Sequence, residues 1–391
     1  MWRVVKWLIG AIIVIILAWL GIWFYAEMRL QQLVEAKLNQ INASGVQQII
    51  YEKLATSHSP LVAGLTLINP QMKITLDPSE PPIVASTARI GAHIDLLHPL
   101  TLHINLSPRI TMNNAGANAV LTFAKTHITE TLNPAIWRGD NQNPITSGEA
   151  NFTGITLLAS DGSLEVAQID RVTIHETLDA TANKDHTALA LTQNIQNFRL
   201  SPLLVKLFNL PFDGQINSLS AHLVLSGPLD WGQIAQQEAN IQDNDQRLQF
   251  LRQHLHQWAQ AGGHATGDLN MWVGPSWLRS SFTLGFDQQV QPEGKAEIYV
   301  NYLDQFTNAL IAAYPGLQDW SSQLQAALSP YLSDTSQDGE VLRLHIHYGQ
   351  HGVFVNDQQT GTMPVINWQT LLMKPEALNS APPQAGSGAA L

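Results

Sequence analysis

The sequence lacks cysteine and contains few charged residues. Cysteine is absent from all 391 positions, which excludes disulfides, thiol nucleophiles and thiolate metal sites. Charged side chains make up only 13% of the chain, and glutamine, asparagine, threonine, serine and histidine supply most of its polar character. A chain without thiols fits an oxidising compartment, where free thiols would be oxidised.

A basic cluster is also missing. The formal net charge is −11, and the lysine and arginine residues are scattered along the chain. Binding to a nucleic acid needs a clustered basic face that neutralises phosphates. We therefore expect no nucleic-acid partner.

Recognisable catalytic motifs are missing as well. There is no Gly-x-Ser-x-Gly nucleophile elbow, no Ser-x-x-Lys, no His-Glu-x-x-His zinc motif and no Gly-rich phosphate loop. No two acidic residues have a spacing along the chain that forces their carboxylates together. We expect a protein that is not an enzyme and that uses no cofactor.

The strongest positive feature is an uncharged run at the N-terminus. Residues 7–26, WLIGAIIVIILAWLGIWFYA, contain no charged side chain. At ~1.5 Å per residue, a helix of this length crosses the ~30 Å hydrocarbon core of a bilayer once. The run is longer than the apolar region of a cleaved signal peptide and has no small-x-small cleavage site at its end. We therefore predict an uncleaved membrane anchor.

The residues at the ends of this run predict how it lies in the membrane. Tryptophan or tyrosine lies near each end, as is typical of membrane–water interfaces. Arg3 and Lys6 precede the run, which predicts a cytoplasmic N-terminus and a body delivered across the membrane. The residues assigned to the anchor are Trp7, Leu8, Ile12, Ile13, Ile16, Leu17, Trp19, Leu20, Trp23, Phe24 and Tyr25.

The periodicity of the apolar residues changes after the anchor. Helical spacing continues to about Asn42, so residues 1–44 are predicted to form the anchor and a juxtamembrane helix. From residue 45 the period is two, which is typical of antiparallel strands with one apolar face. The predicted strands are 61–68, 72–76, 87–97, 100–106, 119–132, 154–160, 165–178, 187–200, 219–226, 267–273, 280–286 and 294–303, with a last hairpin at about 340–366.

Two helical segments interrupt these strands within one β-rich domain, residues 45–373. The segment at about 231–261 is predicted to lie on a sheet face, and the segment at about 303–333 is a helical pair. Residues 374–391 are rich in Pro, Ala, Gly and Ser and are predicted to be disordered. The apolar stripe of the first segment comprises Ile234, Ile241, Leu248, Leu251, Leu255 and Trp258. The fold class is mainly β (α+β): a long curved antiparallel sheet with helical inserts, preceded by one transmembrane helix.

Three of the fourteen histidines lie close together in VLRLHIHYGQHGVFV, residues 341–355. His345 and His347 share one face of a predicted strand, and His351 follows in a Gly-flanked turn. Arg343 shares that face and would repel a cation. We interpret these histidines as the polar face of a strand, with a metal site as the alternative. The other strand histidines have the same interpretation, because nothing in the sequence clusters them.

Two stretches carry a resemblance to a known family. VQQIIYEKLATSHSPLVAGLTLINPQMKI (46–74) and LRLHIHYGQHGVFVNDQQTGTMPVI (342–366), together with the Trp-rich span, resemble the domain-of-unknown-function 2125 family of alphaproteobacterial envelope proteins. The resemblance implies a single-pass protein of the bacterial inner membrane with its bulk in the periplasm. The layout is also similar to the AsmA-like group, which has a long curved sheet facing the periplasm and is associated with phospholipid movement and outer-membrane homeostasis.

Three hypotheses for the function follow. In the first, the sheet forms a groove whose apolar face binds or moves lipid, or supports envelope homeostasis. In the second, the core is closed, and the chain is a structural or adaptor protein that contacts another envelope protein through 231–261 or the C-terminal hairpin. The third is a hydrolase with unfamiliar motif spacing. One-faced strands favour the first, because a long apolar surface either packs on helices or holds a lipid.

Overall fold

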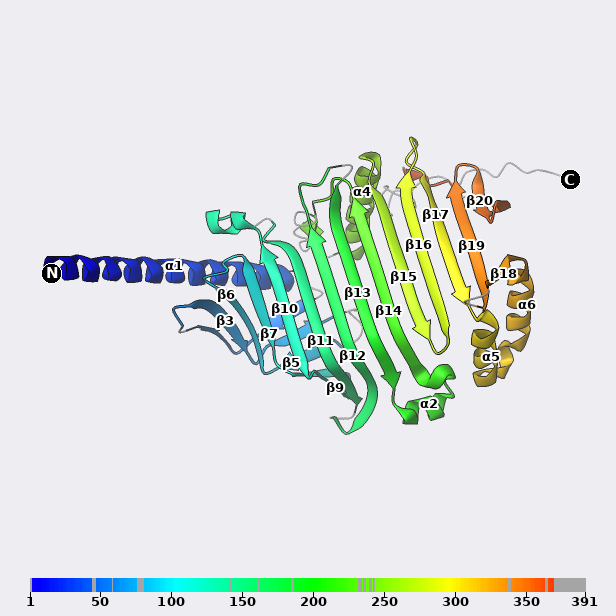
Figure 1. Ribbon diagram of the computed structural model, residues 1–391, viewed down its shortest axis with the longest axis horizontal. Coiled ribbons are helices and arrows are strands. Elements are labelled where there is room, and N and C mark those ends of the chain that lie inside the picture. The colour runs from blue at the N-terminus through cyan, green and yellow to red at the C-terminus, as the bar shows by residue number, and fades with distance from the viewer. Residues whose placement is uncertain are drawn as a thin grey trace.

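The computed structural model consists of a long N-terminal helix followed by a chain of antiparallel strands (Figure 1). The structure describes residues 2–43, 47–57, 59–75, 81–140, 143–159, 162–183, 186–230, 234, 237–238, 241, 243–335, 339–362 and 365–368. Helix α1 (Trp2–Ala43) runs unbroken through the predicted anchor and juxtamembrane segment. It contains a segment long and apolar enough to cross a membrane. The tail at 374–391 lies outside the described residues.

Most strands follow one another in a single antiparallel ladder, which confirms the predicted fold class. The ladder twists along its length and carries the C-terminal hairpin at the end opposite α1 (Figure 1). A short strand, β18 (Leu332–Thr335), pairs with residues 339–342 at the beginning of β19 (Gly339–Gly349). In spatial order the strands of the ladder are β2 (Lys53–Thr56), β3 (Val62–Ile68), β6 (Arg89–Asp95), β7 (Thr101–Leu106), β10 (Lys125–Leu132), β11 (Ile145–Ala159), β12 (Leu164–Leu178), β13 (Thr187–Leu200), β14 (Gln215–Ser226), β15 (His264–Val273), β16 (Ser276–Phe286), β17 (Pro292–Asn301), β19 (Gly339–Gly349), β20 (Gly352–Val355) and β21 (Gln358–Gly361).

The ladder divides at β11, which pairs with two strands along one edge. Its first part pairs with β10, and its last four residues pair with β9. At the division Gly154 has a φ of 58°, and a Cβ there would lie 2.7 Å from the Cβ of Ala124, so glycine is required. The second branch comprises β9 (Ala117–Thr122), β8 (Arg109–Asn114), β5 (Ile83–Thr87), β4 (Gln71–Ile74) and β1 (Gln47–Ile50).

This division corrects one predicted strand. The sequence predicted a single strand over 119–132, whereas the structure has β9 and β10 separated by Phe123 and Ala124. The backbone N–H of Ala124 donates to the carbonyls of Thr153 and Gly154, at 2.9 and 3.2 Å. The chain therefore changes pairing partner at the fork while its alternation of apolar residues continues.

Helix α1 contacts both branches, through β3 and through β1. At its end the Asn42 side chain donates to the carbonyl of Ile49 at 3.2 Å and accepts from the N–H of Ile49 at 2.6 Å. The buried apolar side chains in the described part of α1, Ala26, Leu30 and Leu38, follow helical spacing and form one stripe. The C-terminal half of α1 is thus part of the domain core.

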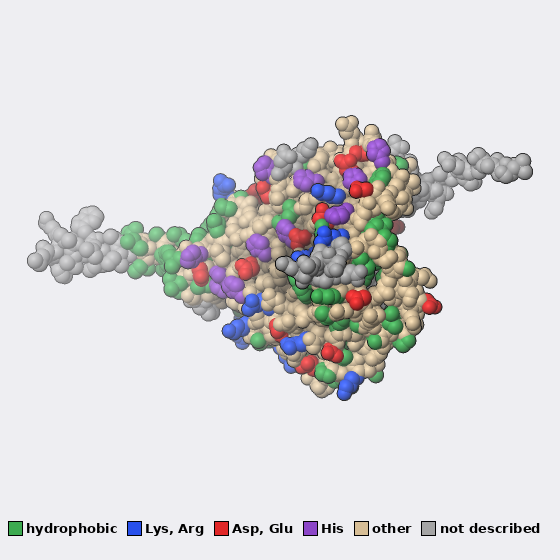
Figure 2. All heavy atoms as spheres, turned by 45° about the vertical axis from the view of Figure 1, so that its right-hand side comes forward, with side chains coloured by type: hydrophobic (Ala, Val, Ile, Leu, Met, Phe, Trp, Pro, Cys, Tyr) green, Lys and Arg blue, Asp and Glu red, His purple; other side chains and the backbone are tan. Residues whose placement is uncertain are grey.

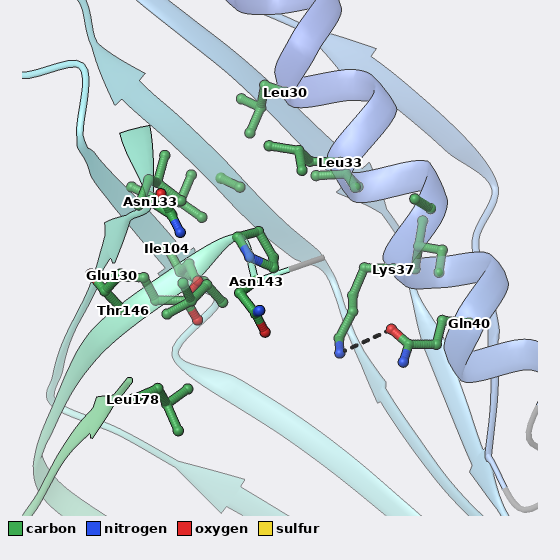
Figure 3. Close-up of a pocket in the computed structure, with 18 of the residues that line it drawn as sticks. Leu30, Leu33, Lys37, Gln40, Ile104, Glu130, Asn133, Asn143, Thr146 and Leu178 are labelled. Carbon is green, nitrogen blue, oxygen red and sulfur yellow. Dashed lines mark hydrogen bonds between the residues drawn. The ribbon is translucent and has the colours of Figure 1, made fainter. Parts of the chain in front are cut away.

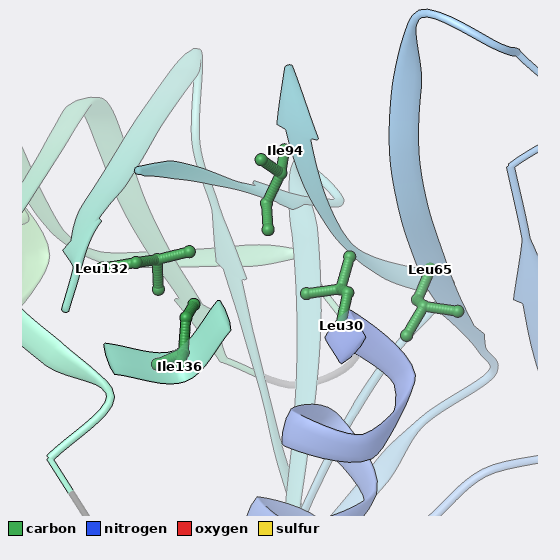
Figure 4. Close-up of a cluster of buried hydrophobic side chains, with 5 residues drawn as sticks. All are labelled: Leu30, Leu65, Ile94, Leu132 and Ile136. Atoms are coloured by element: carbon green, nitrogen blue, oxygen red, sulfur yellow. The ribbon is translucent and has the colours of Figure 1, made fainter. Parts of the chain in front are cut away.

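The main hydrophobic cluster of the N-terminal half is built around this stripe. Leu30 of α1 meets side chains from β3, β6 and β10 and from the 3₁₀ turn η1 (Pro134–Arg138), all of which converge on one point (Figure 4). Each member is at most 3% exposed. The members are Leu30, Leu65, Ile94, Leu132 and Ile136.

The C-terminal half carries the remaining helices. α5 (Leu303–Ala313) and α6 (Gln318–Leu328) confirm the predicted helical pair. α4 (Asn244–Gln260) confirms the later part of the predicted 231–261 helix, and most of the earlier part lies outside the described residues. A short helix that the sequence did not predict, α2 (Pro202–Phe208), follows β13.

The predicted packing of α4 is wrong for three of its leucines. Leu248, Leu251 and Leu255 are 49%, 39% and 44% exposed, although the sequence predicted that they lie on the sheet. Trp258 sets the rotation of the helix instead. Its indole Nε1 donates to the carbonyl of Ser226 at 2.9 Å, and its ring is only 6% exposed and packs edge-on against Phe286.

Candidate functional site

A groove lies between α1 and the sheet, with a volume of about 860 Å³. Residues 30–40 of α1 form one wall, and β2, β3, β6, β7 and β10 form much of the facing wall (Figure 3). The side chains that line it are mostly apolar and include Leu33, Val34, Leu67, Ile90, Ile104 and Leu178. Small-molecule pockets usually measure ~300–1,000 Å³ and have mostly apolar linings. We call this space the α1 groove.

The strand register explains why the sheet side of the groove is apolar. Leu178 at the groove pairs with Leu189, and the row continues on the same face through the next three strands. We call this the inner face of the sheet. The row comprises Leu178, Leu189, Leu225, Ala265 and Leu284.

Two glutamates interrupt the apolar inner face. Glu130 of β10 pairs with Gly148 of β11, and Gly148 pairs with Glu176 of β12. Directly paired residues point to the same face, so the two carboxylates flank the glycine. A Cβ at Gly148 would lie 3.0 Å from Oε1 of Glu176, which leans over it. Within the described part of the chain, neither carboxylate accepts a hydrogen bond.

No spacing along the chain forces these two acids together, so the sequence left paired carboxylates open. The two glutamates are 46 positions apart in the numbering, 130 to 176, and the cross-strand register brings them together. A pattern in the sequence could have revealed them. Glu130 alternates with Ile128 and Leu132, and Glu176 lies in the same way between Ile174 and Leu178. Each acid therefore occupies the apolar phase of its strand.

Burial and neighbouring charges shift the pKa of Glu130. Desolvation by burial raises the pKa of this carboxyl above its ordinary value, and the like charge of Glu176 raises it further. The Lys37 ammonium on α1 opposes both effects. Lys37 Nζ donates to Oε1 of Gln40 at 3.3 Å, on the helix side of the groove (Figure 3). The groove thus combines an apolar wall with carboxylates on one side and an ammonium on the other.

Comparison with known proteins identifies the family. The model of a family described as an uncharacterised protein conserved in bacteria, DUF2125, matches residues 23–350. The chain belongs to the DUF2125 family. No curated protein and no solved structure matches it. The residues that line the α1 groove all lie within the part of the chain that the DUF2125 model matches.

The three histidines of the last hairpin lie as the sequence predicted, two on a strand and one in the turn after it. His345 and His347 are exposed on one face of β19, and His351 is exposed in the turn before β20. His345 Nδ1 lies 3.8 Å from Oε1 of Glu297, and the His347 ring lies 6.4 Å from the ring of Phe354. In the described ranges, no group of three or more His, Cys, Asp or Glu side chains has a geometry that could hold a metal ion.

The other strand histidines also lie on a polar strand face, as interpreted from the sequence, but the register clusters several of them, which the sequence did not indicate. One row of directly paired residues crosses the face opposite the inner face, which we call the outer face. His222 Nδ1 in this row lies 3.4 Å from Oδ1 of Asp268, and the rings of His93 and His103 stack with centroids 5.0 Å apart. Histidine and acidic side chains are interspersed over one face of the molecule in Figure 2. The row comprises His93, His103, Thr129, Glu149, His175, Thr192, His222, Asp268, Ser281, Glu297 and His345.

The anchor residues fall into two groups in this DUF2125 chain. Five of the anchor side chains on α1 are exposed, as expected of a surface that faces lipid, although the Tyr25 hydroxyl also donates to the carbonyl of Trp137 at 2.6 Å: Ile16, Leu17, Leu20, Phe24 and Tyr25. Trp19 and Trp23 are half-buried, and their indole N–H groups bond to the domain. The side chains of Trp7, Leu8, Ile12 and Ile13 are outside the described part of the structure.

Proposed function

We propose that this protein is anchored in the bacterial inner membrane and that its α1 groove binds the acyl part of a lipid or related amphiphile. The observation that carries the proposal is the position of the groove. One of its walls is formed by residues 30–40 of α1, the helix whose uncharged run ends at residue 26. The binding space therefore begins about one helical turn from the apolar segment.

The physical chemistry of the groove suits such a ligand. Each methylene that leaves water contributes ~0.8 kcal/mol, so part of one acyl chain is enough for favourable binding. The apolar row through Leu178 and Leu189 extends the groove surface along the inner face. Glu130 and Lys37 supply polar groups of opposite charge for the end of the ligand that is not apolar.

The proposed orientation places the N-terminus in the cytoplasm and the sheet in the periplasm. Arg3 and Lys6 precede the uncharged run, and positive residues favour the cytoplasmic side. The absence of cysteine fits an oxidising compartment. The layout, an anchor followed by a long one-faced sheet, is similar to that of the AsmA-like group, and we extend the proposal to lipid movement or envelope homeostasis on this similarity.

Lipid extraction and mass spectrometry of the purified full-length chain test the proposal. Wild-type protein, solubilised in detergent and washed, is expected to retain lipid at a fixed ratio. Ala92→Trp fills the groove, because Ala92 is on its sheet wall, and is expected to lower that ratio. Ala117→Trp is the matched control, because Ala117 is exposed in β9. Wild-type protein without stoichiometric lipid, or equal retention in both variants, would contradict the groove as a lipid site.

A second candidate function, an envelope adaptor, has one specific observation in its favour. The exposed leucines of α4, Leu248, Leu251 and Leu255, form an unpacked apolar stripe of the kind that often marks protein contacts. A triple substitution of these leucines by Gln that abolishes cross-linking to a specific envelope protein, with lipid retention unchanged, would favour this function.

A further inference from the structure

Two turns of the domain lie beside the membrane anchor and expose leucine at their tips. The β2–β3 turn carries Leu61, which is 61% exposed, and the β6–β7 turn carries Leu97, which is 76% exposed. The two turns are joined to each other, because the N–H of Leu96 donates to the carbonyl of Leu61 at 3.2 Å. Exposed leucines in two adjoining turns form an apolar tip without a cover from the described residues of this chain.

Two tryptophans of helix α1 donate hydrogen bonds to the backbone of this tip. Trp19 Nε1 donates to the carbonyl of Pro60 at 2.8 Å, and Trp23 Nε1 donates to the carbonyl of Val62 at 3.2 Å. Next to these bonds Ala26 of α1 packs on Ala63 and Leu96. The position of the tip along the helix is therefore fixed at the level of Trp19 and Trp23.

That level falls within the apolar segment of α1. Trp19 and Trp23 both belong to the uncharged run 7–26. On the outward side of the same turns, Leu20 and Phe24 are 40% and 66% exposed, and the exposed apolar surface continues to Met28. From Trp19 to Met28 the helix rises about 13 Å. A bilayer that covers Leu20 and Phe24 on the outward side of α1 thus reaches the two turns on its other side.

We propose that the domain rests in the membrane surface, with Leu61 and Leu97 inserted among the lipids. The partner of this tip is the lipid surface itself. Asp95 and His98 flank Leu97 and remain at the level of the headgroups, where polar side chains are solvated. The two turns and α1 form a second membrane contact that restricts tilting of the domain. Since groove-lining residues begin at Leu30, this contact holds the α1 groove close to the headgroup layer.

The absence of cysteine makes single labels at chosen positions straightforward. The full-length chain is reconstituted into liposomes of phosphatidylethanolamine and phosphatidylglycerol, and an environment-sensitive fluorophore is attached to Leu61→Cys or Leu97→Cys. Lipids that carry a quencher near the headgroup report contact with the bilayer. Ile16→Cys provides the membrane reference, because Ile16 is exposed in the anchor. Leu207→Cys is the matched control, because Leu207 is 68% exposed on α2, far from α1 (Figure 1).

Labels at Leu61→Cys and Leu97→Cys are expected to be quenched several-fold more strongly than the label at Leu207→Cys. If the Ile16→Cys label is quenched while those at the two turns behave like the control, the proposal is wrong. A blue-shifted emission at the turns without lipid quenching would show that a second copy covers them, and would overturn it too. Adding Leu97→Asp to the Leu61→Cys chain is expected to weaken quenching at that label, whereas Leu207→Asp is expected to leave it unchanged.

Discussion

The inner and outer faces of the sheet are made by the same strands, and they differ in how they tolerate polar residues. The outer face carries a row with five histidines and three acids, which reach water or one another. The inner face carries two glutamates beside Gly148, in rows that are otherwise largely apolar. Polar residues on the outer face need no special explanation. Those on the inner face cost free energy, so they indicate a site.

The largest expected effect compares two neighbouring residues of β10 on opposite faces. Leu132 is 2% exposed in the cluster around Leu30, whereas Thr131 points outward and is exposed. Leu132→Ala is expected to lower the free energy of unfolding by about 2–5 kcal/mol, because it leaves a cavity in a packed cluster. Thr131→Ala is expected to change it by no more than about 0.5 kcal/mol. Chemical denaturation of both variants measures the difference. Similar losses of unfolding free energy in the two variants would show that the inner and outer positions of β10 do not differ in their contribution to stability.

The second prediction compares a glutamate on each face. Burial raises the folded-state pKa of Glu130 above 4.5, so the unfolded chain ionises at a lower pH than the native chain. Above the native pKa the native state carries a charge penalty, and below the unfolded pKa that penalty is absent. Glu130→Gln is therefore expected to raise the free energy of unfolding at pH 7–8, with a gain that disappears as pH falls below 4.5.

Glu149→Gln is the control for this prediction. Glu149 is exposed on the outer face of β11, where it pairs with His175, and its replacement is expected to have little effect at pH 7–8. Thermal unfolding of both variants across pH 4–8 separates the two. A loss of stability in Glu130→Gln at neutral pH would show that the carboxylate is compensated by Lys37 more than it is penalised by burial.

The alternation of apolar residues predicted the long central strands well. The predicted strands 165–178 and 187–200 agree with β12 and β13 to within one residue. The first part of β11 was missed, because the small residues Gly148 and Ala150 occupy two of its inner positions and leave Phe152 as the one large apolar side chain between residues 146 and 153. A strand could thus be predicted only where large apolar residues alternate clearly along it.

The groove was predicted only as a consequence of one-faced strands. Its location depends on contacts between distant residues, such as the fork at Gly154 and the docking of α1 by Trp19 and Asn42. These depend on register, which no local pattern specifies. In contrast, the sequence contains a local signal for the beginning of α2, because Ser201 caps the helix and Pro202 occupies its first position. That helix was missed although its signal was present.

The smallest expected effect belongs to the outer face, at His93. Burial lowers the pKa of His93 below 6.5, His103 lowers it further, and Asp95 opposes both. Asn105 Nδ2 lies 3.1 Å from Nδ1 of His93, and only an unprotonated ring nitrogen accepts a hydrogen bond there.

Between pH 6.5 and the lower native pKa, the unfolded chain binds a proton that the native chain resists, so stability falls as pH falls. His93→Gln is expected to flatten this part of the stability curve, whereas His345→Gln, exposed at the other end of the row, is expected to flatten it less. Thermal unfolding of both variants between pH 7 and 5 measures the slopes. Equal slopes in wild type and His93→Gln would show that His93 binds its proton as readily in the native state as in the unfolded chain, and would contradict the prediction.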